Sequence, residues 1–372
     1  MKRLLLLTIS VIVALLIAEA ALRLVFPEDE KYYIWQPNLH HVFHPDTTVF
    51  DGIAGDKEFS INSTGARGDV FTSATKNYVC VGGSTTECVY LDNKEAWPYL
   101  LQQQLGKGYT ISSVGKSGVT TREHYLHVKY TVRKLEHVNG VILSTGINDF
   151  MKCLSQGDGY NDGFEFTKQV EDSLVNTIFL KTGRRQYGAW WRRTAIFNLV
   201  KNAYSSGSKY VAWQILDDNG ANLNTWRANR ASAAQLLDTM PNLEQALDEY
   251  ERNLQLIYNE TKAQGLDLIC VSQPAIYTDS MSAYENSLLW MGGVGAYQSE
   301  RGHIYYSAKA LRQGLDRYNQ RLQAFCMRNG IHFLDANAAL PRNTTVFYDD
   351  CHFNKNGAQL LSKYLAQAWP HQ

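Results

Sequence analysis

The sequence predicts an α/β fold: a three-layer α/β/α sandwich with a five-stranded, mainly parallel sheet at its centre. The first observation behind this prediction is a set of short, almost wholly apolar runs that end in glycine or polar residues. Such runs are typical of parallel strands that are buried on both faces. The second observation is that apolar residues between the runs recur every three to four positions, the period of an amphipathic helix. The runs cover 78–81, 110–114, 140–144, 266–271 and 331–334.

The composition fits a globular protein of this class. The chain has 372 residues, of which 45% are hydrophobic, and its 36 Lys and Arg balance its 36 Asp and Glu. This length suits one large α/β domain with insertions, or two to three domains. Because nucleic-acid binding usually needs a basic excess on one face, we expect no nucleic-acid partner.

Residues 1–26 differ from the rest and predict a membrane segment. Lys2 and Arg3 precede an uncharged, mostly aliphatic run over 4–18. As a helix, residues 4–26 would extend roughly 34 Å at about 1.5 Å per residue, which is enough to cross a bilayer core of about 30 Å. We therefore expect a transmembrane anchor, with its basic start in the cytoplasm and the remaining residues beyond the membrane.

A cleaved signal peptide is the alternative for the same segment. It would have a short basic start, an apolar middle, and a small-x-small cleavage site at Ala18, Glu19 and Ala20. In the anchor, Glu19 and Arg23 stand four positions apart on a helix and could pair near the far interface.

The rest of the chain divides into a lead-in and a main domain. Residues 27–76 are rich in aromatic and turn-forming residues and predict short strands, and residues 77–372 hold the five runs named above. Between the third and fourth runs we expect a helical insertion, or cap, over about 155–240. The clearest helical patterns of the main domain cover 96–105, 242–264, 308–329 and 356–368.

The insertion is rich in tryptophan and arginine. Its tryptophans could stack on sugar rings and its arginines could hold anionic groups. Core packing, or a basic surface that is exposed or faces the membrane, is the favoured explanation of the same residues. The residues in question are Trp190, Trp191, Trp213, Trp226, Arg184, Arg185, Arg192 and Arg193.

Six cysteines occur without a C-x-x-C pair, which argues against a zinc ribbon and against a thioredoxin-like redox motif. Cys80 and Cys270 lie in apolar runs and predict buried thiols. Export would permit a disulfide among Cys88, Cys153 and Cys351, which lie in expected loops.

Polar residues follow four of the expected strands, where ligands of open parallel sheets bind. A serine hydroxyl needs a base, and a histidine oriented by a carboxylate is the usual one. Ser84 fits the nucleophile, His352 the base, and Asp349, three residues before it, the orienting carboxylate. Asp350 is expected to point elsewhere. Asp349, Asp350 and His352 could also ligate a metal, but no second cluster of His or Cys supports one, so we predict no metal site.

The same strand ends supply donors for the negative charge that develops on a substrate carbonyl oxygen. The backbone N–H groups of Ser84 and Gly118 and the side-chain amide of Asn148 are suitably placed to form such an oxyanion hole. Each motif alone is weak: Gly-Gly-Ser-Thr can be a simple turn into a helix, and an Asp–His pair can be a surface contact. Their order at the ends of successive strands favours the catalytic interpretation.

These motifs resemble the blocks of the SGNH hydrolases, also called GDSL esterases, over about residues 77–368. The resemblance implies a flavodoxin-like SGNH fold, no cofactor, and the catalytic and oxyanion roles given above for Ser84, Asp349, His352, Gly118 and Asn148. The chain departs from many members at Ser113 and Lys116 of the second block. The matching residues are Gly82-Gly83-Ser84-Thr85-Thr86, Ser117-Gly118, Gly146-Ile147-Asn148-Asp149, and Asp349 with His352.

The function expected from the resemblance is ester hydrolysis through an acyl-enzyme. The anchor and the segment 62–68 resemble membrane-tethered bacterial members, so the expected substrate is an O-acyl or O-acetyl ester on a cell-envelope glycan or a related lipid, at the periplasmic face of the inner membrane. After signal cleavage the enzyme would instead be secreted. Gln273 and Trp290 follow the fourth strand and could line the substrate cleft.

Two other functions fit the same residues. An O-acyltransferase would use the same triad with a sugar hydroxyl as acceptor in place of water. A non-catalytic envelope protein that binds carbohydrate or assists assembly would use the tryptophan-rich insertion instead.

Overall fold

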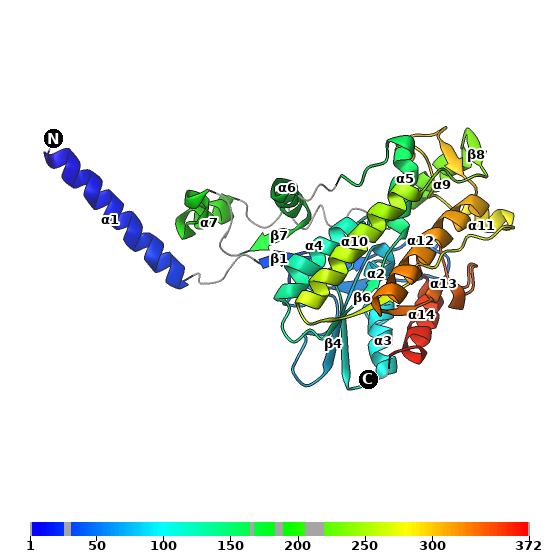
Figure 1. Ribbon diagram of the computed structural model, residues 1–372, viewed down its shortest axis with the longest axis horizontal. Coiled ribbons are helices and arrows are strands. Elements are labelled where there is room, and N and C mark those ends of the chain that lie inside the picture. The colour runs from blue at the N-terminus through cyan, green and yellow to red at the C-terminus, as the bar shows by residue number, and fades with distance from the viewer. Residues whose placement is uncertain (1, 26–30, 164–166, 183–188, 205–218, 371–372) are drawn as a thin grey trace. The chain divides into compact units, whose positions relative to one another are not determined.

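The computed structural model describes residues 2–25, 31–163, 167–182, 189–204 and 219–370 (Figure 1). The chain forms two compact units. Unit 1 combines Met1–Gln36 with Phe179–Leu216, and unit 2 combines Pro37–Ile178 with Asp217–Gln372. The middle of the expected insertion therefore belongs with the N-terminal segment, whereas its two ends belong to the main domain.

The core of unit 2 is a five-stranded sheet in the order β11-β9-β6-β4-β5. All of its strand pairs are parallel, so the sheet is wholly rather than mainly parallel. The three central strands are almost completely buried, which explains why they read as continuous apolar runs. The strands are β4 (Lys76–Gly82), β5 (Tyr109–Ser113), β6 (Gly140–Ser144), β9 (Asp267–Val271) and β11 (His332–Leu334).

Helices cover both faces of this sheet and confirm the predicted α/β/α sandwich. On one side α3 (Trp97–Leu105) packs against α14 (Lys355–Gln367). On the other, α10 (Glu244–Ala263) packs between α4 (Thr121–Leu126) and α12 (Ala308–Asn329), and Figure 1 shows α10 and α12 side by side. The shorter helices of unit 2 are α2 (Ser84–Glu87), α5 (Ile147–Gln156), α6 (Lys168–Ile178), α9 (Ala221–Ala231), α11 (Ala283–Ser287) and α13 (Ala336–Ala339), with single turns at η1 (His127–Thr131), η2 (Val132–Lys134) and η3 (Gly157–Gly159).

Two small sheets lie beside the main one. β2 (His40–Phe43) pairs with β3 (Lys57–Ser60) in the antiparallel sense, as the lead-in pattern predicted. β8 (Gln235–Leu237), near the end of the expected insertion, pairs in parallel with β10 (Ile304–Tyr306).

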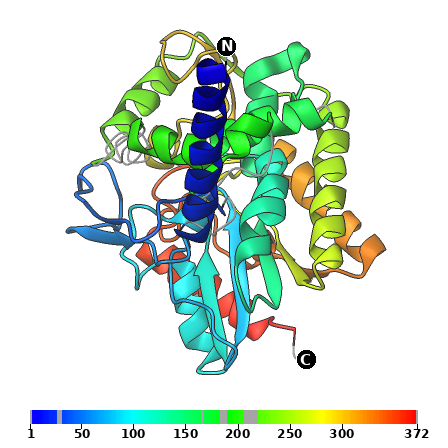
Figure 2. The same cartoon turned by 90° about the vertical axis from the view of Figure 1, so that its left-hand side faces the viewer.

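Unit 1 contains the apolar N-terminal helix α1 (Lys2–Val25). Its mean hydropathy reaches 2.6, and it is the one helix in the described part of the chain that is long and apolar enough to cross a membrane. The unit also holds β1 (Lys31–Tyr33) paired antiparallel with β7 (Leu180–Thr182), the turn η4 (Trp190–Arg193), and α7 (Ala195–Tyr204), which contacts α1 (Figure 2). Arg184, Arg185 and Trp213 lie outside the described residues.

All six cysteines are free, buried thiols. Burial of Cys80 and Cys270 agrees with their place in apolar strands. The three thiols for which a bridge was considered, Cys88, Cys153 and Cys351, are equally buried and unbridged. Cys153 lies within α5 rather than in the loop expected for it, and Cys88 directly follows α2. The thiols are held in the core, so no disulfide constrains the fold.

Candidate active site

Ser84 stands where β4 ends and α2 begins, directly after two glycines. A Cβ on Gly82 would lie 2.2 Å from Thr86 Oγ1 and 2.7 Å from the carbonyl oxygen of Ser144, so packing against the backbone favours glycine there. A Cβ on Gly83 would lie 2.6 Å from Asn148 Nδ2 and would displace that amide. As the first residue of α2, Ser84 carries a backbone N–H without an acceptor inside the helix.

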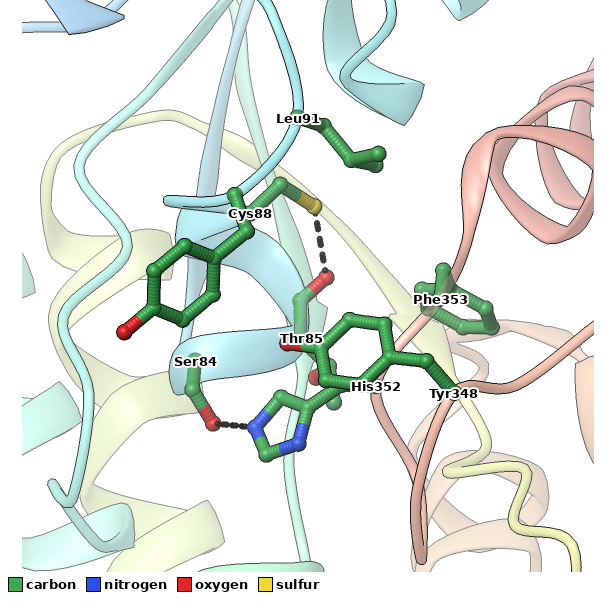
Figure 3. A pocket seen from close by; sticks show the side chains of 8 residues that line it. Ser84, Thr85, Cys88, Leu91, Tyr348, His352 and Phe353 are labelled. Atoms are coloured by element: carbon green, nitrogen blue, oxygen red, sulfur yellow. Dashed lines mark hydrogen bonds between the residues drawn. The ribbon is translucent and has the colours of Figure 1, made fainter. Parts of the chain in front are cut away.

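The structure brings Ser84 together with the two distant residues predicted to activate it. Ser84 Oγ lies 2.6 Å from His352 Nε2 (Figure 3). On the other side of the ring, His352 Nδ1 lies 2.7 Å from Asp349 Oδ2. The segment between α13 and α14 carries both Asp349 and His352, and Asp349 Oδ1 also accepts the backbone N–H of His352 at 2.9 Å. Ser84, His352 and Asp349 thus form a continuous hydrogen-bonded series of hydroxyl, imidazole and carboxylate.

Asp349 is buried and surrounded by donors. Cys351 donates its backbone N–H to Oδ1 at 3.0 Å, and Trp290 donates its indole Nε1–H to Oδ2 at 3.0 Å. Burial raises the pKa of Asp349, but the charge of His352 and the hydrogen bonds from His352 and Trp290 outweigh it, so the pKa lies below its usual value. The carboxylate therefore stays ionised and keeps His352 Nδ1 protonated.

His352 responds in the opposite direction. Burial lowers its pKa, but the charge of Asp349 more than compensates and holds the pKa well above its ordinary value. The side-chain donor atoms of Asp349, Cys351 and His352 lie within 4.8 Å of one another, a spacing that would also suit a metal. Here His352 Nε2 faces Ser84 and Nδ1 faces Asp349, so each ring nitrogen has a hydrogen-bond partner within the protein.

Asp350 points away from the histidine, as predicted. Its carboxylate accepts the Tyr277 hydroxyl at 2.9 Å and the backbone N–H of Trp290 at 2.8 Å. Burial, and then the neighbouring charge of Asp349, raise the pKa of Asp350 to about 6. Asp350 thus holds the backbone of Trp290, whose side chain in turn contacts Asp349.

The expected oxyanion donors come from the ends of β5 and β6. Gly118 has φ of +76°, a left-handed conformation that favours glycine, and a Cβ there would meet no atom within 4 Å. Asn148, in the first turn of α5, donates one Nδ2–H to the carbonyl of Val119 at 2.8 Å. This bond joins the second and third motif segments and leaves the second N–H of the Asn148 amide for a ligand.

Glu87 is a structural member of the site that the motifs did not reveal. Its buried carboxylate accepts the backbone N–H of Ser117 at 2.7 Å, bonds the Ser117 hydroxyl, and lies 3.7 Å from Lys116 Nζ. These contacts fix the second-block loop that carries Gly118. They also give Lys116, one of the departures from the family pattern, a partner.

Arg67 is a second such residue, supplied by the lead-in segment. Its guanidinium donates to the carbonyls of Glu87 (2.6 Å), Cys88 (2.9 Å) and Leu91 (2.7 Å). Burial lowers the pKa of Arg67 to about 10. The buried cation holds the segment that follows α2, the helix that begins with Ser84. No motif in the sequence around Arg67 predicted this role.

Gln273 and Trp290 do not line the hollow beside Ser84. Gln273 is buried, accepts the Thr85 hydroxyl at 3.3 Å and donates to the Pro274 carbonyl at 2.9 Å. Trp290 is buried against Asp349 and packs on Trp226 of α9, with ring centroids 4.6 Å apart. In the structure both side chains are therefore engaged with protein groups rather than with the hollow.

The hollow beside Ser84 is small and aromatic (Figure 3). Its volume of about 10 Å³ is close to the room that one water needs. The Tyr348 ring stacks on the His352 imidazole with an interplanar angle of 11°. The lining residues are Ser84, Thr85, Cys88, Tyr90, Leu91, Tyr348, His352 and Phe353.

Comparison with solved structures finds similar chains among bacterial esterases. Axe2, an acetylxylan esterase from Geobacillus stearothermophilus, has 13% identity and a TM-score of 0.42, with 81% of this chain and 98% of that chain covered. The aryl esterase of M. smegmatis has 12% identity and a TM-score of 0.41, with 79% and 97% covered. A GDSL-like lipase from Bacteroides thetaiotaomicron has 15% identity and a TM-score of 0.39, with 81% and 90% covered.

No curated protein matches the chain. The model of the GDSL-like lipase/acylhydrolase family matches residues 80–360, a span that includes every motif segment described above. Because this match covers most of the sequence, the chain belongs to the GDSL-like lipase/acylhydrolase family and is a serine carboxylic ester hydrolase.

Proposed function

We propose that Ser84, His352 and Asp349 are the catalytic triad of this esterase. His352 Nε2 takes the proton of Ser84 Oγ as the hydroxyl attacks the ester carbonyl, and Asp349 stabilises the imidazolium that forms. Collapse of the tetrahedral intermediate expels the alcohol, which receives that proton. Water activated by His352 then attacks the acyl-enzyme, and the acid is released as Ser84 regains its proton.

The negative charge of each tetrahedral intermediate is held by three donors in this proposal. They are the backbone N–H groups of Ser84 and Gly118 and the free N–H of the Asn148 amide. Support comes from their fixed positions: Glu87 holds the Gly118 loop through Ser117, and Asn148 holds it through the Val119 carbonyl and lies over Gly83. Donors placed before the reaction stabilise the transition state without reorganisation.

The substrate in this proposal carries a short acyl group, such as acetyl, on a cell-envelope glycan. The small hollow beside Ser84 favours a short acyl group over a long chain, because little room is preformed there. The aromatic walls formed by Tyr90, Tyr348 and Phe353 support a sugar or another flat apolar partner. The apolar helix α1 supports a site on the outer, periplasmic side of the inner membrane.

The observation that carries the proposal is the 2.6 Å contact between Ser84 Oγ and His352 Nε2. Its test is a series of p-nitrophenyl esters from acetate to octanoate, assayed on the full chain in detergent. We expect kcat/KM to be highest for acetate and to fall steeply with acyl length, and Ser84→Ala to lower turnover by about a thousandfold or more. A preference for octanoate would contradict the short-acyl substrate, and near-wild-type activity in Ser84→Ala would contradict the nucleophile.

The same assay separates hydrolysis from acyl transfer. In the presence of an acetyl-free glycan acceptor, hydrolysis predicts that acetate release continues at an unchanged rate. Transfer of the acetyl group to the glycan at the expense of free acetate would instead assign the chain as an O-acyltransferase, because both reactions share the steps up to the acyl-enzyme.

A further inference from the structure

Unit 1 exposes a cluster of large apolar side chains next to α1. Trp190 is 78% exposed, Trp191 44%, Leu199 44% and Val200 52%. They come from η4 and α7, within a stretch of eleven residues, 190–200. Soluble surfaces rarely gather exposed tryptophan and aliphatic side chains in this way, and such patches mark interaction sites.

The start of α7 is bound to α1 through Glu19. The Glu19 carboxylate accepts the backbone N–H groups of Ala195 at 2.8 Å and Ile196 at 3.1 Å. Thr194 Oγ1 accepts the next one, from Phe197, at 3.2 Å. The first N–H groups of a helix have no partner within it, so Glu19 and Thr194 together complete the amino-terminal turn of α7.

This link also accounts for a carboxylate in an apolar helix. An ionised side chain inside a membrane segment is costly unless it is paired. The Glu19 side chain is only 15% exposed and forms an ion pair of 2.7 Å with Arg23, in addition to its bonds to α7. The positive end of the α7 dipole further stabilises its negative charge.

The position of Glu19 along α1 sets the depth of α7. Glu19 lies roughly 25 Å from Lys2 along the axis, at about 1.5 Å per residue. With Lys2 and Arg3 at the cytoplasmic surface, Glu19 is then near the outer edge of a hydrocarbon core of about 30 Å. Trp190 and Trp191 would lie at the level of the lipid headgroups, where tryptophan is enriched in membrane proteins.

Arginine beside the tryptophans fits the same environment. The Arg192 guanidinium lies 4.8 Å from the centroid of the Trp191 ring, and the Trp191 ring meets Phe197 edge to face at 5.1 Å. The cation is thus held on the aromatic surface, where it can meet the phosphate of an anionic lipid.

We propose that residues 190–204 form a second membrane contact: an interfacial helix that lies in the outer headgroup layer of an anionic bilayer and is fastened to α1 by Glu19. The inference rests on the anchoring helix of the proposed localisation and goes beyond it. It has a consequence for processing: α1 is retained, because cleavage at Ala18-Glu19-Ala20 would remove the residue that caps α7.

The first test measures depth in the bilayer. Variants of the full chain that each add one exposed cysteine, Trp190→Cys, Leu15→Cys and Met327→Cys, are labelled with an environment-sensitive fluorophore and reconstituted in vesicles of phosphatidylcholine and phosphatidylglycerol. Lipids that carry a spin label near the headgroup then quench the shallow fluorophores. Met327 is the matched control, because it lies in unit 2 and is 76% exposed. The labelled wild type gives the background from the six buried thiols.

We expect blue-shifted, strongly quenched emission at position 190, at least threefold more quenched than at position 327. Position 15 should respond to spin labels placed deep in the acyl chains. Water-like, unquenched emission at position 190 with a buried position 15 would overturn the interfacial helix and leave the anchor intact. Water-like emission at both positions would overturn the anchor as well.

The second test concerns the link. Glu19→Leu removes the cap of α7 and leaves an apolar helix, whereas Arg23→Gln removes the ion pair and leaves the cap. In the Trp190→Cys background, Glu19→Leu should reduce headgroup quenching at least twofold, and Arg23→Gln should change it far less. Equal quenching in both variants would overturn the assigned role of Glu19.

The third test concerns retention. The intact mass of the chain purified from membranes should include residues 1–26. A mature chain that begins between residues 19 and 27 would overturn the inference, because α7 would then have lost its partner.

Discussion

At the residue scale, the geometry of Ser84, His352 and Asn148 leads to different kinetic losses. Ser84→Ala removes the nucleophile and should lower kcat by about a thousandfold or more, and His352→Ala should do the same. Asn148→Ala removes one oxyanion donor and should lower kcat by about a hundredfold or more, with little change in KM.

Steady-state kinetics with an acetyl ester measures these losses. Because Asn148 also bonds Val119, the thermal unfolding of Asn148→Ala is followed in parallel to separate catalysis from folding. An unchanged kcat in a folded Asn148→Ala variant would remove this residue from the oxyanion site.

The two adjacent aspartates provide a second prediction, in the pH dependence. The base must be neutral, so kcat/KM falls on the acid side as His352 becomes protonated. Because the charge of Asp349 holds the pKa of His352 well above its ordinary value, the acid limb in the wild type should have its midpoint above pH 6.5. Asp349→Asn should lower kcat by about 10⁴-fold and move the midpoint to lower pH.

Asp350→Asn is the matched control for this experiment. Asp350 is equally buried and adjacent, but it faces Tyr277 and the backbone of Trp290. Its replacement should leave the midpoint within a few tenths of a pH unit and cost far less in kcat. Comparable losses at both positions would reverse the assignment of the orienting carboxylate.

At the scale of elements, the carboxylate of Asp149 connects two helices behind the oxyanion loop. It lies in the first turn of α5 and accepts the backbone N–H of Thr121, at the start of α4, at 3.1 Å. Burial raises its pKa to about 7, although the Thr121 bonds oppose the shift. Asp149 follows Asn148 directly, so this bond helps to hold the amide in place.

The raised pKa of Asp149 makes stability depend on pH. A carboxyl whose pKa is about 7 when folded and about 3.9 when unfolded binds its proton more tightly in the folded state. Its contribution is therefore present at low pH and is lost as pH rises from about 4 to about 7. As pH rises through this range, the wild type should lose this contribution and Asp149→Asn should not. The free energy of unfolding of the variant should therefore rise relative to that of the wild type by the order of a few kcal/mol.

Denaturant unfolding at pH 4.5 and pH 7.5 measures the difference. Asp248→Asn, which changes an exposed carboxylate on α10, is the control and should show no such gain. A constant difference between Asp149→Asn and wild type at the two pH values would contradict the buried, proton-binding role.

The helix α9 supports the segments that carry Asp349 and Trp290. Trp226 packs on Trp290, Arg227 donates to the Tyr348 carbonyl at 2.7 Å, and Arg230 donates to the Met291 carbonyl at 2.6 Å. These contacts hold Tyr348, which directly precedes Asp349, and Met291, which directly follows Trp290. The end of the expected insertion thus supports the chain next to Asp349 and Trp290.

Trp290→Phe tests this frame. It removes the indole donor to Asp349 and keeps the backbone bond to Asp350. We expect kcat to fall about tenfold with little change in KM. The acid midpoint of kcat/KM should move slightly upward, because a carboxylate that loses a donor attracts the His352 proton more strongly.

Trp226→Phe is the matched control, since the Trp226 ring packs on Trp290, whereas the indole that donates to Asp349 is that of Trp290. It should lower thermal stability without moving the pH midpoint. If Trp290→Phe has a normal kcat and an unchanged acid midpoint of kcat/KM, the indole contributes packing and not a functional hydrogen bond to Asp349.

At the scale of the whole molecule, the apolar helix α1 predicts the membrane topology. Lys2 and Arg3 should remain in the cytoplasm, so the end of the chain should lie on the other side. A reporter enzyme that is active only outside the cytoplasm, fused after Gln372, should be active. The same fusion with residues 1–26 deleted should be inactive, and activity of that control or inactivity of the full fusion would contradict the topology.

Much of this protein could be predicted from its sequence, because the signals were local. The wholly apolar strands β4, β6 and β9 needed no knowledge of distant residues, since burial on both faces leaves only apolar side chains. Ser84, Asn148, Asp349 and His352 were found because the ends of parallel strands meet at one edge of a sheet.

The tertiary structure alone decided which residues hold that site together. Glu87 and Arg67 bind loops through backbone groups that any sequence would supply, so no motif marks them. Trp290 became a partner of Asp349 rather than a wall of the cleft because Asp350 fixes its backbone, a contact between segments about 60 residues apart. Local sequence specifies strands and reactive groups, whereas contacts between distant segments depend on packing that only the folded chain creates.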